Sequence, residues 1–210
     1  MRIALYAVII SFLVGCSSMY YAGMEKVGVH KRDIMVDRVK DVQESQEEAQ
    51  KEFKSALEHF GTLVSIKDTE LKKAYERFND EYEDAKEAAE EVSENIDKLE
   101  DVSLALFKEW QEEIKQYTNT QLKRRSQKQF RETKRRYEKM MRSMRRAEKS
   151  MEPILATFHD NVLFLKHSLN AQAIGALAGE FKSLKANIKT LIAQMNASIK
   201  ESDAFIKELK

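Results

Sequence analysis

Apolar and small residues recur through the middle of the chain in steps that alternate between four and three positions. The series runs Leu71, Tyr75, Phe78, Tyr82, Ala85, Ala89, Val92, Ile96 and Leu99, and after Ser103 it resumes at Leu106, Trp110, Ile114 and Tyr117. This 3.5-residue period predicts a helix with a narrow apolar stripe that faces partner helices. Neither Gly nor Pro interrupts the stretch, so the predicted helix is about 70 Å long. The same phase predicts that Phe78, Tyr82, Ile96 and Leu106 are buried.

The period continues on both sides of this stretch and predicts an all-α fold. Helices are expected over residues 34–64, 69–117, 120–169 and 171–209, because the phase of the stripe breaks between them. Short connections make neighbouring helices antiparallel. The sequence therefore predicts an elongated antiparallel up-down four-helix bundle with coiled-coil packing, formed by a single domain over residues 34–210.

The predicted helix boundaries carry their own signals. Asp68 fits an N-cap for the second helix and Asn170 fits one for the fourth. Thr118 and Gln121 have the spacing of a capping box ahead of the third helix. Pro153 lies inside the third helix, where an interior proline costs ~3 kcal/mol. The stripe keeps its phase through Pro153, which favours a kink over a break, and both alternatives stay open.

Composition agrees with a long helical chain. Charged residues make up 34% of the 210 residues, and there are only six Gly and one Pro. The formal net charge is +1, which excludes a globally basic nucleic-acid binder. We therefore expect no nucleic-acid partner.

The first residues have the character of a bacterial targeting segment. Arg2 is positive, and the apolar run from Ile3 to Val14 is shorter than the roughly 20 residues that span a bilayer. The tetrapeptide Leu13–Cys16 resembles the lipobox of bacterial lipoproteins, which implies cleavage before Cys16 and a diacylglycerol on its thiol. The prediction is a signal peptide over residues 1–15 and a lipidated tether over 16–33. The alternative is an ordinary signal peptide with an incidental cysteine.

Lipidation also bears on thiol chemistry and on location. Cys16 is the only cysteine, so its lipidation leaves no thiol for a disulfide, a metal site or catalysis. Lipoproteins of this type are sorted by the residue after the cysteine, where Asp favours the inner membrane. Ser17 implies the outer membrane, on its periplasmic face, with the inner membrane as the alternative. More than one acyl chain makes such an anchor stable.

Three runs of residues resemble an uncharacterised family of Gram-negative lipoproteins that carry a domain of unknown function. They are residues 20–33, residues 151–154 and residues 161–171. The resemblance covers nearly the whole chain and implies a lipidated, helical periplasmic protein. It implies no activity.

No motif for catalysis or cofactor binding occurs. Di-iron sites in four-helix bundles use Glu-x-x-His on two helices, and no His of this chain has a Glu three positions before it. His159 and His167 lie eight positions apart and give at most one weak metal-binding pair. A phosphate-binding Gly loop, an HExxH motif and a nucleophile elbow are also absent from the sequence. We expect no enzymatic activity, no metal and no cofactor.

Charge is sorted between the second and third predicted helices. Acidic residues dominate over 76–101 and basic residues over 123–149. One interpretation is that the two helices pair and that these charges fix partner and register. The other is that surplus Arg faces outward and meets acidic partners or the phosphates of membrane headgroups and lipopolysaccharide. The candidate membrane or anion contacts are Lys123, Arg124, Arg125, Lys128 and Arg131.

These observations predict a non-enzymatic lipoprotein that acts as a structural scaffold, spacer or adaptor toward a protein partner in the cell envelope. The alternative is a lipid-binding or membrane-organising module that uses the basic third helix. The turn at residues 118–121 is expected at the membrane-proximal end, because the first helix leads away from the anchor and the second returns. The small residues from Gly175 to Gly179 predict close approach of a helix or an aromatic ring, with self-association as the alternative.

Overall fold

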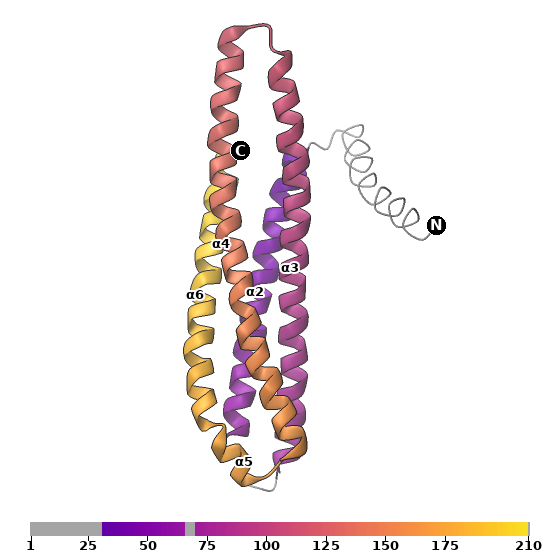
Figure 1. Cartoon of the computed structure of the whole chain (residues 1–210), viewed down its shortest axis with the longest axis vertical. Coiled ribbons are helices and arrows are strands. Elements are labelled where there is room, and N and C mark those ends of the chain that lie inside the picture. The colour runs from indigo at the N-terminus through magenta and orange to yellow at the C-terminus, as the bar shows by residue number, and fades with distance from the viewer. Residues whose placement is uncertain (1–30, 66–69, 210) are drawn as a thin grey trace, which may run out of the picture.

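The computed structural model describes residues 31–65 and 70–209, and every regular element in this part of the chain is helical (Figure 1). The elements are α2 (Lys31–Leu63), α3 (Leu71–Gln116), α4 (Thr120–His167), α5 (Ala171–Ala176) and α6 (Ala178–Leu209). The predicted all-α bundle is confirmed. Residues 1–15, Cys16, Ser17 and Asp68 lie outside the described residues.

The four long helices form an elongated bundle in which each helix packs against two neighbours. Helix α2 contacts α3 and α6, and α4 contacts α3 and α6. Nζ of Lys31 at the start of α2 lies 3.1 Å from Oε2 of Glu109, near the end of α3. At the other end, Nδ1 of His59 lies 3.4 Å from Oε1 of Glu81. Helices α2 and α3 are therefore antiparallel.

Aromatic rings join the helices across the core at both ends of the four-helix part. Near α5, Phe60 of α2 stacks on Phe78 of α3 with ring centroids 4.8 Å apart, and Phe78 meets Phe158 of α4 at 5.7 Å. Toward the other end, Phe107 of α3 meets Tyr137 of α4 at 5.2 Å. Such ring pairs stabilise by ~0.5–1.5 kcal/mol beyond the area they bury.

The predicted burial is correct for Phe78, Tyr82 and Ile96, which are all buried, and wrong for Leu106. Leu106 is only half-buried, and the neighbouring Phe107 occupies the core instead. The difference is local, because Ser103 and Ile114 on either side are buried at their predicted positions. Phe107, one residue further on, packs edge to face against Phe130 and Tyr137 of α4, and this contact turns Phe107 rather than Leu106 into the core.

Two of the predicted N-caps need correction. Helix α3 has Glu70 at its N-cap position, without a side-chain cap hydrogen bond, where the sequence predicted Asp68. The N-cap of α4 is Asn119 and not Thr118: Oδ1 of Asn119 accepts hydrogen bonds from the backbone N–H of Gln121 at 2.9 Å and of Leu122 at 3.1 Å. Asn is at least as good an N-cap as Thr, and here it stands one residue closer to the helix. The cap predicted at Asn170 is present, since Oδ1 of Asn170 accepts from the N–H of Ala173 at 3.0 Å.

The helix predicted over 171–209 is in fact two helices, α5 and α6. They are separated at Leu177, whose N–H donates to the carbonyl of Ile174 at 3.0 Å, a three-residue step that closes α5. Glycines on both sides lower the local helix propensity. Helix α4 is unbroken at Pro153, so the alternative of a break there is wrong.

Close approach of an aromatic ring occurs, but not at the predicted small residues. A Cβ added to Gly175 or Gly179 would meet nothing within 4 Å, so these positions face open space. A Cβ added to Gly61 would lie 2.9 Å from Cε2 and Cζ of Phe181. Gly61 of α2 is therefore the residue that admits an aromatic side chain of α6.

Candidate membrane-facing tip

Helices α3 and α4 extend beyond their neighbours and form a two-helix projection at one end of the molecule (Figure 1). Helix α2 begins at Lys31, level with Glu109, and α6 ends beside Arg136, which forms an ion pair with Glu208. From Arg136 back to Thr120, α4 rises about 24 Å beyond the end of α6, and among the described residues the start of α2 faces it only across the cleft lined by Lys31, Gln129 and Thr133. We call the part of this hairpin from Trp110 to Arg136 the tip.

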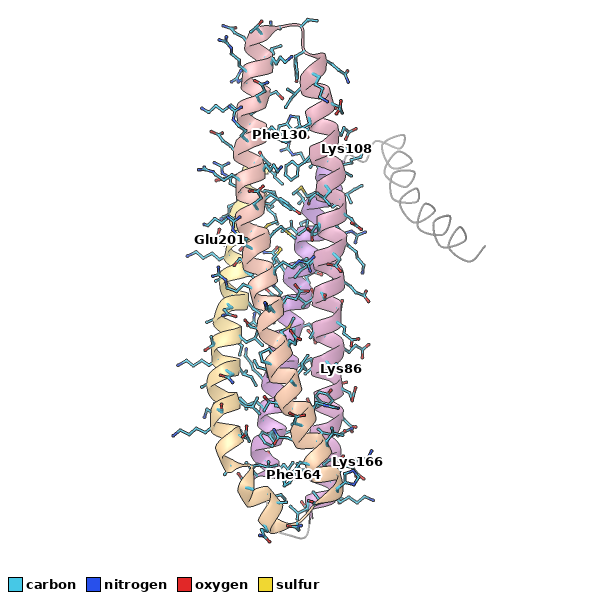
Figure 2. All side chains as sticks on the ribbon, viewed as in Figure 1. Lys86, Lys108, Phe130, Phe164, Lys166 and Glu201 are labelled. Carbon is cyan, nitrogen blue, oxygen red and sulfur yellow. The ribbon has the colours of Figure 1, made fainter. Side chains whose placement is uncertain are left out.

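Side chains between α3 and α4 hold the two helices of the tip together. The indole Nε1–H of Trp110 donates to Oγ of Ser126 at 3.0 Å. The rings of Trp110 and Phe130 meet edge to face at 5.5 Å, and Phe107 meets Phe130 at 5.8 Å. Figure 2 shows Phe130 between the two helices. The tip is thus a packed helical hairpin, not a pair of loose ends.

The surface of the tip combines apolar and basic side chains. Tyr117 is 40% exposed and Leu122 is 49% exposed, although both belong to the apolar series that predicted the bundle. They are uncovered because α2 and α6 end before reaching them. Membrane-interface segments commonly combine aromatic, aliphatic and basic side chains. Tyr117, Leu122 and the neighbouring cations give the end of the hairpin this composition.

The five residues predicted from sequence as anion contacts all lie on the α4 side of the tip. Lys123 is half-buried, and Arg124, Arg125, Lys128 and Arg131 are exposed. Within the described part of the chain, the only ion pair among them joins Lys128 to Glu132 at 4.0 Å. Four of the five charges are therefore not neutralised inside the described fold.

Three of these cations stand in an unfavourable place for the helix itself. The first turn of α4 contains no acidic residue, and Lys123, Arg124 and Arg125 follow directly after it. The helix macrodipole is positive at this end and acts mainly within the first turn, where an acid would stabilise the helix and a cation does not. The positions of these cations are not explained by the stability of α4.

Further along α4, charges do pair with neighbouring helices. The Arg145 guanidinium lies 2.5 Å from Asp97 and 2.7 Å from Glu100 of α3, and also contacts Glu148 of its own helix. Partial burial alone lowers the pKa of Arg145, but hydrogen bonds to Glu100, Asp97 and Glu148 outweigh it and raise that pKa above its usual value. Pairing inside the hairpin, one of the two interpretations of the sorted charges, thus accounts for Arg145.

Other bases of α4 pair with α6 and not with the acidic helix. Nζ of Lys139 lies 2.8 Å from the Glu201 carboxylate, and Arg136 pairs with Glu208. Figure 2 shows Glu201 on the α6 side of this contact. Ion pairs between α3 and α4 therefore neutralise only a few of the basic residues over 123–149.

The structure also brings together three carboxylates that sequence analysis did not single out. Ligand atoms of Glu52 on α2 and of Glu81 and Asp84 on α3 lie within 4.8 Å of one another. Burial raises the pKa of Glu52, and repulsion from Glu48, Asp84 and Glu81 raises it further. The register of α2 against α3 creates this group, and the residues are too far apart in sequence to reveal it.

Several clefts lie between the described helices, and both α3 and α4 line two of them. One, of about 530 Å³, sits where α2 begins and α6 ends, and its wall includes Trp110 and the ion pair of Lys31 with Glu109. The other, of about 800 Å³, runs between α3 and α4, and its wall includes Ser93, Glu148 and His159. Oγ of Ser93 donates to Oε1 of Glu148 at 2.7 Å, but among the described residues no hydrogen bond joins His159 to this pair, so the wall holds no connected nucleophile, base and orienting group.

In the part of the chain that the structure describes, no helix has the length and apolar character needed to cross a bilayer.

The fold and the tip define an all-α rod with a basic hairpin projection. The chain belongs to the family described as "Protein of unknown function (DUF2959)", which matches residues 20–209. Comparison with curated proteins and with solved structures gives no match.

Proposed function

We propose that this protein is a lipoprotein anchored through Cys16 to the periplasmic face of the outer membrane, where it acts as a non-enzymatic scaffold or spacer. The proposal rests on the end of the rod at which the described chain enters it. The described chain enters the bundle at Lys31, level with Glu109, on the side of the basic tip. The lipobox-like Leu13–Cys16 lies only fifteen residues before that point. An anchor there places the tip toward the membrane and the α5 end away from it.

The core supports a structural role. Apolar side chains of all four long helices fill it, and the fully buried ones include Phe53, Phe78, Met144 and Leu184. The length of α4, about 72 Å at 1.5 Å per residue, gives a rod that sets a distance between two surfaces. The described clefts hold no connected nucleophile, base and orienting group, and the role that we propose is not enzymatic.

The anchor is tested by replacing the cysteine. Cys16→Ala is expected to abolish metabolic labelling with an alkyne palmitate and to release the protein from the outer-membrane fraction. Ser17→Asp is the matched control, expected to keep the label and to move the protein to the inner-membrane fraction. Label on the Cys16→Ala variant would contradict the anchor.

A second candidate function is binding to anionic lipid through the tip, favoured by the exposed Tyr117 and Leu122 beside unpaired cations. Each basic residue near an anionic surface contributes ~1 kcal/mol. Changing Lys123, Arg124 and Arg125 to Glu is expected to weaken binding of the non-lipidated chain to anionic vesicles at least tenfold, with unchanged helicity. Changing Lys182, Lys185 and Lys189 of α6 to Glu is the control. Equal flotation of the tip variant and the wild type would refute lipid contact by the tip.

A further inference from the structure

Two exposed stripes of opposite charge run along α3 and α4 with the same seven-residue spacing. The acidic stripe consists of Asp80, Glu87, Glu94 and Asp101. The basic stripe consists of Lys128, Arg135, Arg142 and Lys149. All eight residues are exposed. Seven residues are close to two turns of a helix, so each stripe keeps to the outer face of its helix over about 32 Å and turns by only ~20° per heptad.

Most of these eight charges form no ion pair within the described fold. Glu94 pairs with Lys98 at 3.4 Å and Lys128 pairs with Glu132 at 4.0 Å, each within its own helix. The other six stripe residues make no ion pair with any described residue. The pairs that cross between helices use other residues, such as Arg145 and Lys139.

The two stripes cannot neutralise each other within one molecule. Both face solvent, and they are also displaced along the rod. Arg145 lies level with Asp97, so the acidic stripe runs from near this level toward the α5 end, while the basic stripe runs from it toward the tip. The centres of the stripes are thus separated by about 20 Å along the axis.

We infer that the acidic stripe of one chain binds the basic stripe of a second copy, so that the rods associate side by side. Equal length, equal spacing and opposite sign make the two stripes complementary at all four positions. Antiparallel packing of α3 against the second copy's α4 opposes their macrodipoles and points both rods in the same direction, with one displaced by about 20 Å. Each copy keeps one stripe free, so the contact is heterologous and extends into a row.

The association does not rest on the proposed anchor, and it is tested on the chain without lipid. The contact consists of exposed ion pairs, which salt screens strongly. The Debye length falls from about 30 Å at 0.01 M salt to about 10 Å at 0.1 M. Association of the rods is therefore expected at low ionic strength and lost at high ionic strength.

Sedimentation velocity on the chain from Ser17 to Lys210, which contains every described residue, tests the inference. The wild type is expected to associate at about 0.01 M salt, with an association constant at least tenfold lower at 0.1 M. A base-reversed variant (Lys128, Arg135, Arg142 and Lys149 to Glu) and an acid-reversed variant (Asp80, Glu87, Glu94 and Asp101 to Lys) are each expected to stay monomeric. An equal mixture of the two variants is expected to associate again, because each then carries the charge that the other lacks.

The matched control reverses four exposed acids on α2, Glu44, Glu47, Glu48 and Glu58, and is expected to associate like the wild type. Circular dichroism checks that all variants are folded. A monomeric wild type at low salt would overturn the inference. So would an acid-reversed variant that behaves like the wild type, because the basic stripe would then act without its acidic counterpart.

Discussion

Gln46 offers the sharpest test of the core, because the structure predicts that removing its polar group stabilises the protein. Gln46 is fully buried in α2, and neither Nε2 nor Oε1 has a hydrogen-bond partner among the described residues. Its neighbours on the same helix are satisfied: Nε2 of Gln43 donates to Oδ1 of Asp203 at 2.9 Å, and Nε2 of Gln50 donates to Oδ1 of Asn196 at 3.2 Å.

The expected gain follows from the cost of burying an amide without partners, ~1–3 kcal/mol in mutational data. Leu has a similar volume and no polar atoms, so Gln46→Leu is expected to raise the free energy of unfolding by about 2 kcal/mol. For a chain of this length, that corresponds to a rise in Tm of about 4–8 °C.

The measurement is thermal unfolding followed by circular dichroism at 222 nm, repeated in urea to obtain the free energy. Gln50→Leu is the matched control, since it removes a hydrogen bond that the structure contains, and its Tm is expected to be unchanged or lower. A Tm for Gln46→Leu below that of the wild type would show that the buried amide of Gln46 stabilises the protein, contrary to the prediction.

Two more predictions concern the core and the carboxylate group. Ile96 is fully buried, so Ile96→Asp places an unpaired charge in the core. This change is expected to lower the free energy of unfolding by more than ~4 kcal/mol. Wild-type-like thermal unfolding of the variant would show that the core-facing positions of α3 are assigned wrongly. The pKa of Glu52 is raised in the folded state by burial and by neighbouring acids, so its charged form destabilises the fold, and stability falls as pH rises through that pKa. Glu52→Gln is therefore expected to raise Tm by about 1–2 °C at pH 7 and to have no effect at pH 4, and an equal effect at both pH values would exclude this cause.

The fold was predictable because the 3.5-residue pattern is a local property of each helix. The positions of Phe78 and Ile96 follow from spacing alone, and so does the break near Asn170. The error at Leu106 arose because the neighbouring Phe107 packs against rings of α4, a contact between helices that spacing along one helix does not reveal. The split at Leu177 escaped prediction because the apolar series continues across it without a change of phase.

Features that depend on how helices are placed against one another were not predictable. Gly61 admits Phe181, and the group of Glu52, Glu81 and Asp84 forms, only because α2 has a particular register with its neighbours. The exposure of Tyr117 and Leu122 had a partial signal in the unequal helix lengths. The five basic residues from Lys123 to Arg131 were identified from charge alone, and the lipidation of Cys16 stays a prediction.

The proposed rod stands with its tip at the membrane and its α5 end away from it. Phe164 lies near the α5 end (Figure 2). Leu122 at the tip and Phe164 are matched probes, because their exposed fractions are 49% and 45%. A photoreactive benzophenone side chain placed at either position of the anchored protein reports which end touches lipid. If the tip faces the membrane, lipid adducts form at position 122 and none form at position 164. Adducts at 164 without adducts at 122 would contradict it.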